Sequence, residues 1–372
     1  MKKLIIFIVF TFSWFCFGQI PTDSILKKAR IGIYDNPDES LRVGNELLGK
    51  EKDPNKKIEI YLVISNAYVA KRNIDKSLKV LLKAKELLNE ATTVELKINL
   101  VIYIAIQYQH MELFSKSFET LDETENYLSK IPNSSSKFSN LGKMYAIRGM
   151  IYKSQANPEL ALEKFFIAKK NFKQAKLSKV NLSNLSVVSY NIAYCFIEMN
   201  QYQNAKKYFI ESASFAKKAN AKSLEAFAYK GMADMYHLNN QHQESLKMLE
   251  DAEKMAENSG DLLLNEGIYK GMADNYLALN NLTEYQFYNK KFQDIRFERK
   301  QSELKSINSS IDNQTKEMQN KREIIASKYT KMNLVISAVF LILAGILIYL
   351  ILKKRKANLA FKNKIRGIML NE

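Results

Sequence analysis

An internal repeat of about forty residues is the feature that most constrains the fold of this chain of 372 residues. The hexapeptide YKGMAD occurs at residues 229–234 and again, unchanged, at residues 269–274. In the register of this repeat, an aromatic residue recurs at intervals of 40 or 44 positions. These markers are Tyr68, Tyr108, Tyr152, Phe196, Tyr236 and Tyr276. Self-similarity at such a period predicts one supersecondary unit stacked many times.

Small and large residues hold fixed positions around each marker. A small residue stands three positions before every marker, at Ser65, Ala105, Gly149, Ala193, Ala233 and Ala273. After most markers come a small residue, a large apolar residue and another small residue, at spacings of nine, thirteen and sixteen positions. The large residues are Leu81, Leu121, Phe165, Phe209 and Leu249. This register predicts a helical hairpin, because small residues let two helices approach and large ones fill the space beside them.

The register resembles the tetratricopeptide repeat over roughly residues 55–290. The resemblance implies an all-α solenoid of helical hairpins, about seven over residues 22–290 when a degenerate first and last hairpin are included. Three features depart from the family pattern. The period is longer than the usual value of about 34, as in long-helix bacterial variants, and the terminal proline is missing. The usual turn glycine is replaced by Arg72, Glu112, Ala156, Asn200, Asn240 and Asn280.

The C-terminal part of the sequence predicts one long helix that enters a membrane. Apolar residues spaced seven apart from Phe297 to Met332 predict a coiled-coil stalk over residues 291–332, and through it a homodimer. A helix folded back on the repeats is the alternative for this segment. Residues 333–352 contain no charged side chain. At about 1.5 Å per residue they would span roughly 30 Å, the thickness of a bilayer's hydrocarbon core.

The two ends of the chain predict its topology. Residues 1–18 have the pattern of a secretory signal peptide, with a basic start, an apolar run and a small residue at Gly18. An uncleaved membrane anchor is the alternative. A basic cluster at residues 353–356 directly follows the apolar segment, and such clusters stay on the cytoplasmic side. We therefore expect a single-pass inner-membrane protein with exported repeats and a short basic cytoplasmic tail, residues 353–372.

The composition excludes several classes of function. The formal net charge is +17, but the lysines are scattered along the whole chain, which is typical of a solvated surface and not of a nucleic-acid site. Without the signal peptide only Cys195 remains, so no intrachain disulfide can form. The three histidines have no metal-ligand spacing, and no phosphate-binding loop or nucleophile motif occurs. We expect no catalytic residues, no metal, no cofactor and no enzymatic activity.

The first helices of the repeats supply the candidate binding residues. Repeat arrays bind extended partner segments along the concave face that these helices line. Projecting the register outward gives nine groove-facing residues: Asn66, Gln109, Lys153, Tyr190, Tyr194, Lys230, Asp234, Lys270 and Asp274. Their mixture suits an amphipathic or acidic segment of a protein or peptide. The alternative for the Lys–Asp pairs is that they only pair with each other, because both are spaced i,i+4 on a helix.

Two functional classes fit this order of parts. The first is a membrane-anchored, non-enzymatic sensor or protein-interaction module. It resembles the periplasmic input half of bacterial membrane-anchored tetratricopeptide-repeat regulators, which carry a DNA-binding or histidine kinase domain after the span. The twenty residues after the span are too few for such a domain, so the output half would be missing from this chain or supplied by a partner. The second class is an envelope scaffold that assembles a membrane complex without signalling.

Overall fold

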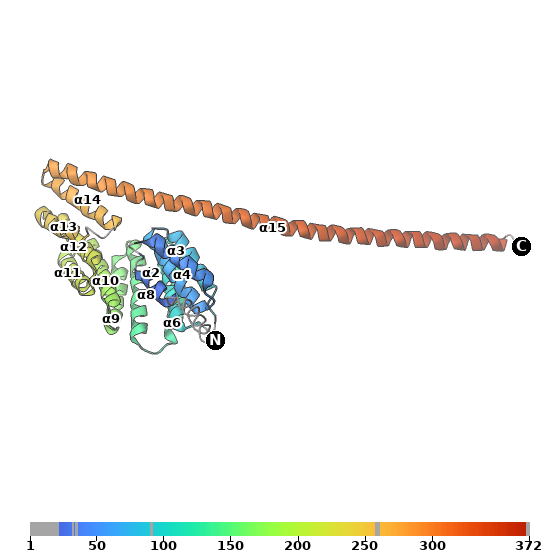
Figure 1. Ribbon diagram of the computed structural model, residues 1–372, viewed down its shortest axis with the longest axis horizontal. Helices are drawn as coiled ribbons and strands as arrows, with labels where there is room; N and C mark the ends of the chain where they lie inside the picture. The colour runs from blue at the N-terminus through green and yellow to red at the C-terminus, as the bar shows by residue number, and fades with distance from the viewer. Residues whose placement is uncertain (1–21, 32, 34–35, 90–91, 257–260, 370–372) are drawn as a thin grey trace, which may run out of the picture. The chain divides into compact units, whose positions relative to one another are not determined.

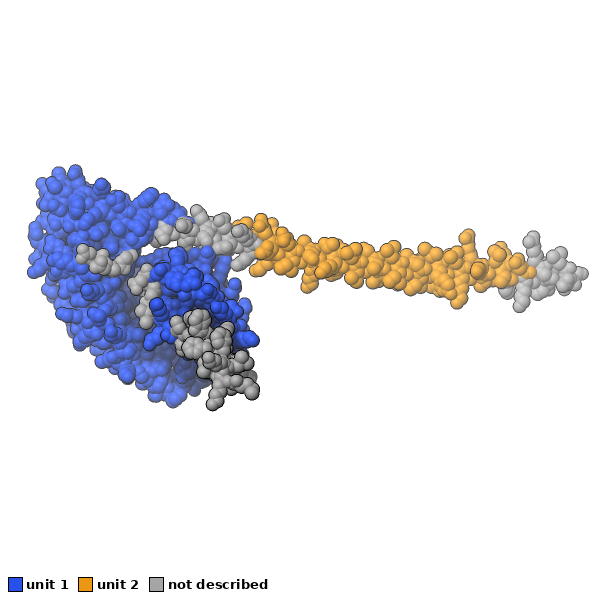
Figure 2. Space-filling model, viewed as in Figure 1, with its two compact units in different colours: residues 1–307 blue, residues 308–372 orange. Residues whose placement is uncertain are grey.

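The computed structural model describes residues 22–31, 33, 36–89, 92–256 and 261–369, and the regular secondary structure of these residues is α-helical. The chain forms two compact units, residues 1–307 and 308–372 (Figure 2). The predicted signal peptide, residues 1–18, lies outside the described residues, as do the last three residues of the predicted tail. The all-α prediction is confirmed.

The first unit is a stack of helical hairpins (Figure 1). In chain order its helices are α2 (Thr22–Ile31), α3 (Pro37–Lys50), α4 (Pro54–Ala70), α5 (Ile74–Lys85), α6 (Val94–His110), α7 (Phe114–Ser129), α8 (Ser135–Ser154), α9 (Pro158–Gln174), α10 (Lys179–Glu198), α11 (Tyr202–Ala219), α12 (Lys222–Leu238), α13 (His242–Ala256) and α14 (Leu262–Ala278), followed by α15 (Leu282–Met369). Each even-numbered helix up to α12 packs against the next helix and against the even-numbered helix of the following hairpin. The even-numbered helices are therefore the first helices of the repeats, and together they line one side of the solenoid.

The sequence register is the packing register of the hairpins. The large residue thirteen positions after each of the first five markers has no exposed surface: Leu81, Leu121, Phe165, Phe209 and Leu249. The small residues lie where the two helices of a hairpin touch. The hydroxyls of Ser65 and Ser77 are 2.7 Å apart across the first such contact. At Gly149 an added Cβ would lie 2.6 Å from the Phe165 ring, so only glycine fits there.

In every hairpin turn from α4 onward, the residue at the same position of the repeat adopts the left-handed conformation. The positions that replace the family's turn glycine have φ between 55° and 59°: Arg72, Glu112, Ala156, Asn200, Asn240 and Asn280. The next residue's N–H then donates to the carbonyl of the aromatic marker, for example Asn73 to Tyr68 at 2.8 Å and Asn281 to Tyr276 at 2.9 Å. This 6→1 hydrogen bond is the Schellman motif, which satisfies a carbonyl at the end of the first helix.

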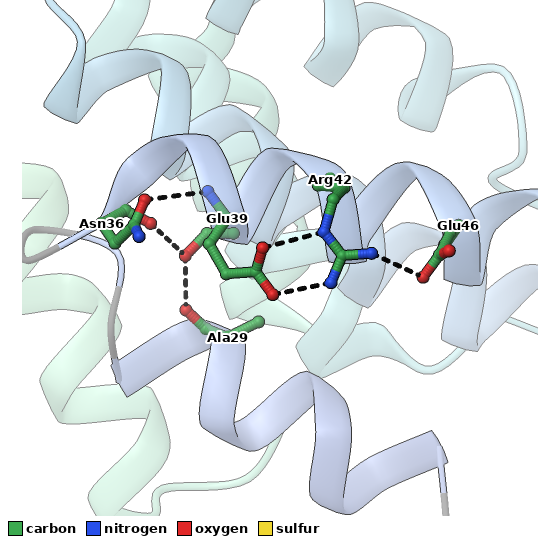
Figure 3. A network of polar contacts seen from close by, with 6 residues as sticks. Ala29, Asn36, Glu39, Arg42 and Glu46 are labelled. Atoms are coloured by element: carbon green, nitrogen blue, oxygen red, sulfur yellow. Dashed lines mark hydrogen bonds and ion pairs between the residues drawn. The ribbon is translucent and has the colours of Figure 1, made fainter.

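The first hairpin is fixed by its own polar contacts (Figure 3). Asn36 caps α3 by accepting the N–H of Glu39 at 3.0 Å, and Pro37 occupies the first turn. The Ser40 hydroxyl reaches back to the Ala29 carbonyl of α2 at 2.9 Å. The exposed pairs that Arg42 makes on α3 add little stability, whereas the Ser40 hydrogen bond joins α3 to α2.

Helix α15 begins as the second helix of the last hairpin. The rings of Tyr276 on α14 and Tyr288 on α15 stack with centroids 5.5 Å apart. Further along, Lys291 pairs with Glu253 of α13 at 3.1 Å, and Arg299 forms a bidentate pair with Glu266 of α14. These contacts replace the small-residue signature that the last repeat lacks.

Beyond these contacts α15 continues without a break to Met369. Among its described side chains, the heptad residues Phe297, Leu304, Met318, Ile325 and Met332 are all exposed. The segment Met318–Ala360 is long and apolar enough to cross a membrane, and none of its most apolar window is buried within the protein. This agrees with the predicted apolar helix over residues 333–352.

Candidate functional site

The nine predicted groove residues all lie on first helices of the repeats. Eight of them are half-buried and Lys270 is exposed. The structure joins five of them into one contact network across α8, α10 and α12: Lys153, Tyr190, Tyr194, Lys230 and Asp234. We call these five residues the groove cluster.

The aromatic part of the groove cluster rests on the core. Tyr190 and Tyr194, one turn apart on α10, have ring centroids 4.8 Å apart. The Tyr194 ring meets the fully buried Phe209 of α11 edge-on at 5.3 Å, and Tyr190 meets Phe227 of α12 at 6.0 Å. Such edge-to-face pairs fix the orientation of a ring beyond what area burial alone does. Both tyrosines are thus part of the packing as well as of the surface.

The polar part of the groove cluster converges on one carboxylate. The Tyr194 hydroxyl donates to Asp234 Oδ2 at 2.7 Å, and Lys230 Nζ donates to the same oxygen at 2.6 Å. Lys153 Nζ lies 4.8 Å from the Tyr194 ring centroid and donates to Asn191 Oδ1 at 3.1 Å. Burial, followed by the charge of Asp234, raises the pKa of Tyr194 well above its ordinary value. The hydroxyl therefore remains a donor at any physiological pH.

Lys153 is the poorly compensated charge of the groove cluster. Burial lowers the pKa of its ammonium, and the nearby Lys230 lowers it further, although Glu198 acts in the opposite direction. Its hydrogen-bond acceptor is the neutral Asn191 side chain, whereas Lys230 has the Asp234 carboxylate. A half-buried ammonium without a bonded carboxylate is stabilised by an incoming anion.

A pocket of about 380 Å³ adjoins the groove cluster on the side of α14. Tyr194, Lys230 and Asp234 form one wall, and Lys270 and Asp274 form the other. Lys270 donates to Asp274 at 2.6 Å, so both Lys–Asp pairs predicted from the i,i+4 spacing are formed. The second wall is more exposed than the first, because the side chains of Lys270 and Asp274 are 59% and 42% accessible.

The remaining two predicted residues lie outside this assembly. Gln109 lines a separate pocket between α6, α8 and α10. Asn66 is half-buried on α4 and lines neither pocket. All nine residues thus lie on first helices, but the groove cluster is confined to the middle and later repeats.

A histidine pair beside the pocket escaped the sequence analysis. The buried Asn275 donates through Nδ2 to the hydroxyl of Ser245 and to the Gly271 carbonyl, each at 2.8 Å. Its Oδ1 lies 2.9 Å from Nδ1 of both His237 and His242. Because an amide oxygen only accepts, both histidines carry their proton on Nδ1. The signal in the sequence was a polar residue, Asn275, directly before the marker Tyr276, where most repeats have an apolar residue.

Chemistry other than recognition has little support at this site. Cys195 is buried on α10, and burial raises the pKa of its thiol to about 12, so the nucleophilic thiolate does not form at neutral pH. Within the described part of the chain, no group of three or more His, Cys, Asp or Glu side chains could hold a metal ion.

The fold and the register point to a known repeat. The tetratricopeptide-repeat family model matches residues 185–258, which span most of α10 to α13 and include the groove cluster's α10 and α12 residues. The fold is a tetratricopeptide-like solenoid. No curated protein sequence matches the chain.

Three solved structures of similar fold match with TM-scores just above 0.5. A Rap protein complexed with Competence and Sporulation Factor matches with a TM-score of 0.54 and 13% identity, covering 75% of this chain and 86% of that one. NprR in complex with its cognate peptide NprX matches with a TM-score of 0.53 and 16% identity, covering 72% and 75%. A signal transduction ATPase with a tetratricopeptide repeat sensor from Pyrococcus horikoshii gives 0.53 and 15%, covering 78% and 46%. At these identities the likeness concerns the fold.

Proposed function

We propose that this chain is a membrane-anchored, non-enzymatic sensor or interaction module that binds a protein or peptide through the groove cluster and the adjoining pocket. The observation that carries the proposal is the composition of that surface. Two tyrosines, two Lys–Asp pairs and an ammonium whose acceptor among the described residues is a neutral amide lie together on four successive first helices, α8, α10, α12 and α14. Tyrosines are enriched at protein-recognition surfaces, and polar and charged side chains typically form the rim around them.

The shape of the surface favours an extended partner over a small molecule. The contacts are spread over α8 to α14, so binding energy would come from several modest contacts along the solenoid. The NprR structure, which is similar in fold, contains a cognate peptide. The partner we infer is a segment with apolar and acidic side chains, because Lys153, Lys230 and Lys270 all lie on this face.

The C-terminal helix supports the membrane anchor. Its apolar side chains over residues 333–352 are exposed, for example Phe340 at 68% and Leu341 at 74%. Placing such a surface in lipid removes it from water, and every backbone group is already bonded within the helix. The exposed side chains among the described heptad residues, from Phe297 to Met332, support a parallel dimer through residues 291–332. In this arrangement the repeats are exported, and residues 353–372 are cytoplasmic.

The test uses a photo-crosslinking amino acid in the full-length chain in its membrane. It is placed at Lys270, on the exposed wall of the pocket, and as a matched control at Lys247, an exposed lysine on the second helix α13. We expect one polypeptide to be captured from Lys270 and not from Lys247. Equal capture at both positions would place the binding surface elsewhere.

The captured polypeptide is then measured against substituted chains. The double variant Lys230→Gln with Lys270→Gln should weaken its binding at least tenfold, about 1.4 kcal/mol, while Lys247→Gln should leave it unchanged. These changes are preferable to removing Tyr190 or Tyr194, because both rings pack on the core. Unchanged binding by the double variant would refute the groove as the site.

A further inference from the structure

A second, smaller pocket lies between α6, α8 and α10, where nothing in the groove cluster reaches. Its volume is about 170 Å³. Ile106, Met150, Phe172 and Val187 are among its apolar walls, and Lys143 is among its polar ones. The volume is below the range of roughly 300–1,000 Å³ that drug-sized ligands occupy, and it fits about one apolar side chain.

Lys143 is a half-buried cation, and no carboxylate among the described residues pairs with it. The one polar contact that the structure shows for its Nζ is with Asn140 Oδ1, at 3.3 Å. Burial lowers the pKa of Lys143, and no neighbouring carboxylate among the described residues offsets this effect. Two other half-buried lysines of the solenoid are paired with a carboxylate, Lys85 with a glutamate at 2.6 Å and Lys291 with another at 3.1 Å. An anion at Lys143 would complete the arrangement that those lysines already have.

Asn184 adds a second hydrogen-bond donor without a carboxylate acceptor to the same pocket. Its side-chain Nδ2 is buried and has no hydrogen-bond acceptor among the described residues. Leaving such a donor unbonded costs about 1–3 kcal/mol, so its position calls for an explanation. None of the described residues that line the pocket is acidic. The pocket thus combines an apolar wall with two donors that lack carboxylate partners, and it is complementary to a group that is apolar and anionic together.

We propose that this pocket holds one apolar side chain of an acidic segment of the partner, with a neighbouring Asp or Glu carboxylate bonded to Lys143 and, after a small movement of its amide, to Asn184. The inference rests on the proposed function, because it concerns the same groove-bound partner. The segment is internal and not a chain end. Gln109 lines the pocket from α6, and Lys153 of the groove cluster lies further along α8, so one extended segment would reach both the pocket and the groove cluster.

The test needs only minimal probes and the full-length chain, purified in detergent with methyl-labelled methionines. The Met150 methyl group lines the pocket and reports occupancy by its chemical shift, assigned with Met150→Leu. The probes are acetyl-Leu-Glu-amide, its neutral isostere acetyl-Leu-Gln-amide, and acetyl-leucine with a free carboxylate. We expect the Glu probe to shift the Met150 signal saturably, with a Kd at least fivefold below that of the Gln probe. The variant Lys143→Gln should bring the two probes within twofold of each other.

Several outcomes would overturn this inference. They are equal binding of the Glu and Gln probes to the unaltered chain, an unresponsive Met150 signal, or tighter binding of acetyl-leucine, which would indicate a chain end. The comparison of probes on the unaltered chain stands even if Lys143→Gln fails to fold. The double variant Lys230→Gln with Lys270→Gln should bind the Glu probe normally. Partner binding that is lost in that variant while the probes leave Met150 unaffected would refute this pocket alone and leave the proposed function standing.

Discussion

Three glycines offer a graded test of the hairpin packing. In α8, an added Cβ at Gly149 would lie 2.6 Å from two atoms of the Phe165 ring, whereas an ordinary contact begins at 3.4 Å. The ring would therefore have to move by about 0.8 Å, inside a core packed as densely as an organic crystal. Phe165 has no exposed surface and lies among buried residues of α8, α9 and α10, so there is no space for it to enter. Overpacking of this kind costs about 1–3 kcal/mol.

Helix propensity acts in the opposite direction, because alanine stabilises a helix interior by roughly 0.5–1 kcal/mol over glycine. Gly149→Ala should therefore destabilise α8 and α9 by about 1–2 kcal/mol in net terms. At Gly271 the nearest atom is the flexible end of Leu249 at 3.1 Å, and Gly271→Ala should be close to neutral. A Cβ added at Gly49 would have no neighbouring atom within 4 Å outside its own stretch of helix, so Gly49→Ala should be slightly stabilising.

The assay is hydrogen exchange of the full-length chain, read peptide by peptide, because exchange reports the free energy of local opening. Faster exchange in α8 and α9 of Gly149→Ala, with no loss of protection in the other two variants, is the expected pattern. If Gly149→Ala were as well protected as the unaltered chain, the register that places Gly149 against Phe165 would be wrong.

Four further predictions concern single residues. Ala156→Gly should raise the free energy of unfolding by about 1 kcal/mol, because Ala156 has φ of 55° and glycine tolerates that conformation better. Asn200→Gly should change the free energy of unfolding less, because asparagine already tolerates that conformation, and denaturant unfolding of the two variants measures the difference. Burial raises the pKa of both Tyr190 and Tyr288 to about 12, so the phenolate absorbance that appears near that pH should be smaller by one tyrosine in Tyr190→Phe. Since the unfolded chain ionises near the ordinary tyrosine pKa, stability should fall as pH rises above about 10. Lys291→Ala should loosen the start of α15 by about 1–2 kcal/mol in hydrogen exchange, because Lys291 lies within 5.2 Å of three ring centroids and pairs with Glu253, while Lys290→Ala, at an exposed position, should change little. Cys195, buried and with a thiol pKa of about 12, should resist alkylation at pH 8 until denaturant is added; rapid alkylation of the folded chain would contradict its burial.

The repeat architecture could be predicted from the sequence because its causes are local and periodic. The spacing of small and large residues follows from the approach of two helices, and the buried Phe165 and Gly149 meet as that spacing requires. The turn positions were also found, even where Arg72 or Ala156 stands in place of glycine, because six registered copies fix the turn more firmly than any single residue type does. The apolar C-terminal segment was found in the same way, from length and composition alone.

Which residues gather into one site was decided by the tertiary structure. The register placed nine residues on one face, but only stacking of α8, α10 and α12 brings Lys153, Tyr194 and Asp234 into contact. Residues that meet in this way are about forty positions apart in the sequence. Their distance in space depends on how each hairpin is rotated relative to the preceding hairpin. The same holds for Lys143 and Asn184. Their burial, and the absence of a carboxylate beside them among the described residues, result from the packing of neighbouring helices. A periodic pattern specifies each hairpin, whereas the site depends on the angles between hairpins, which the periodic pattern does not encode.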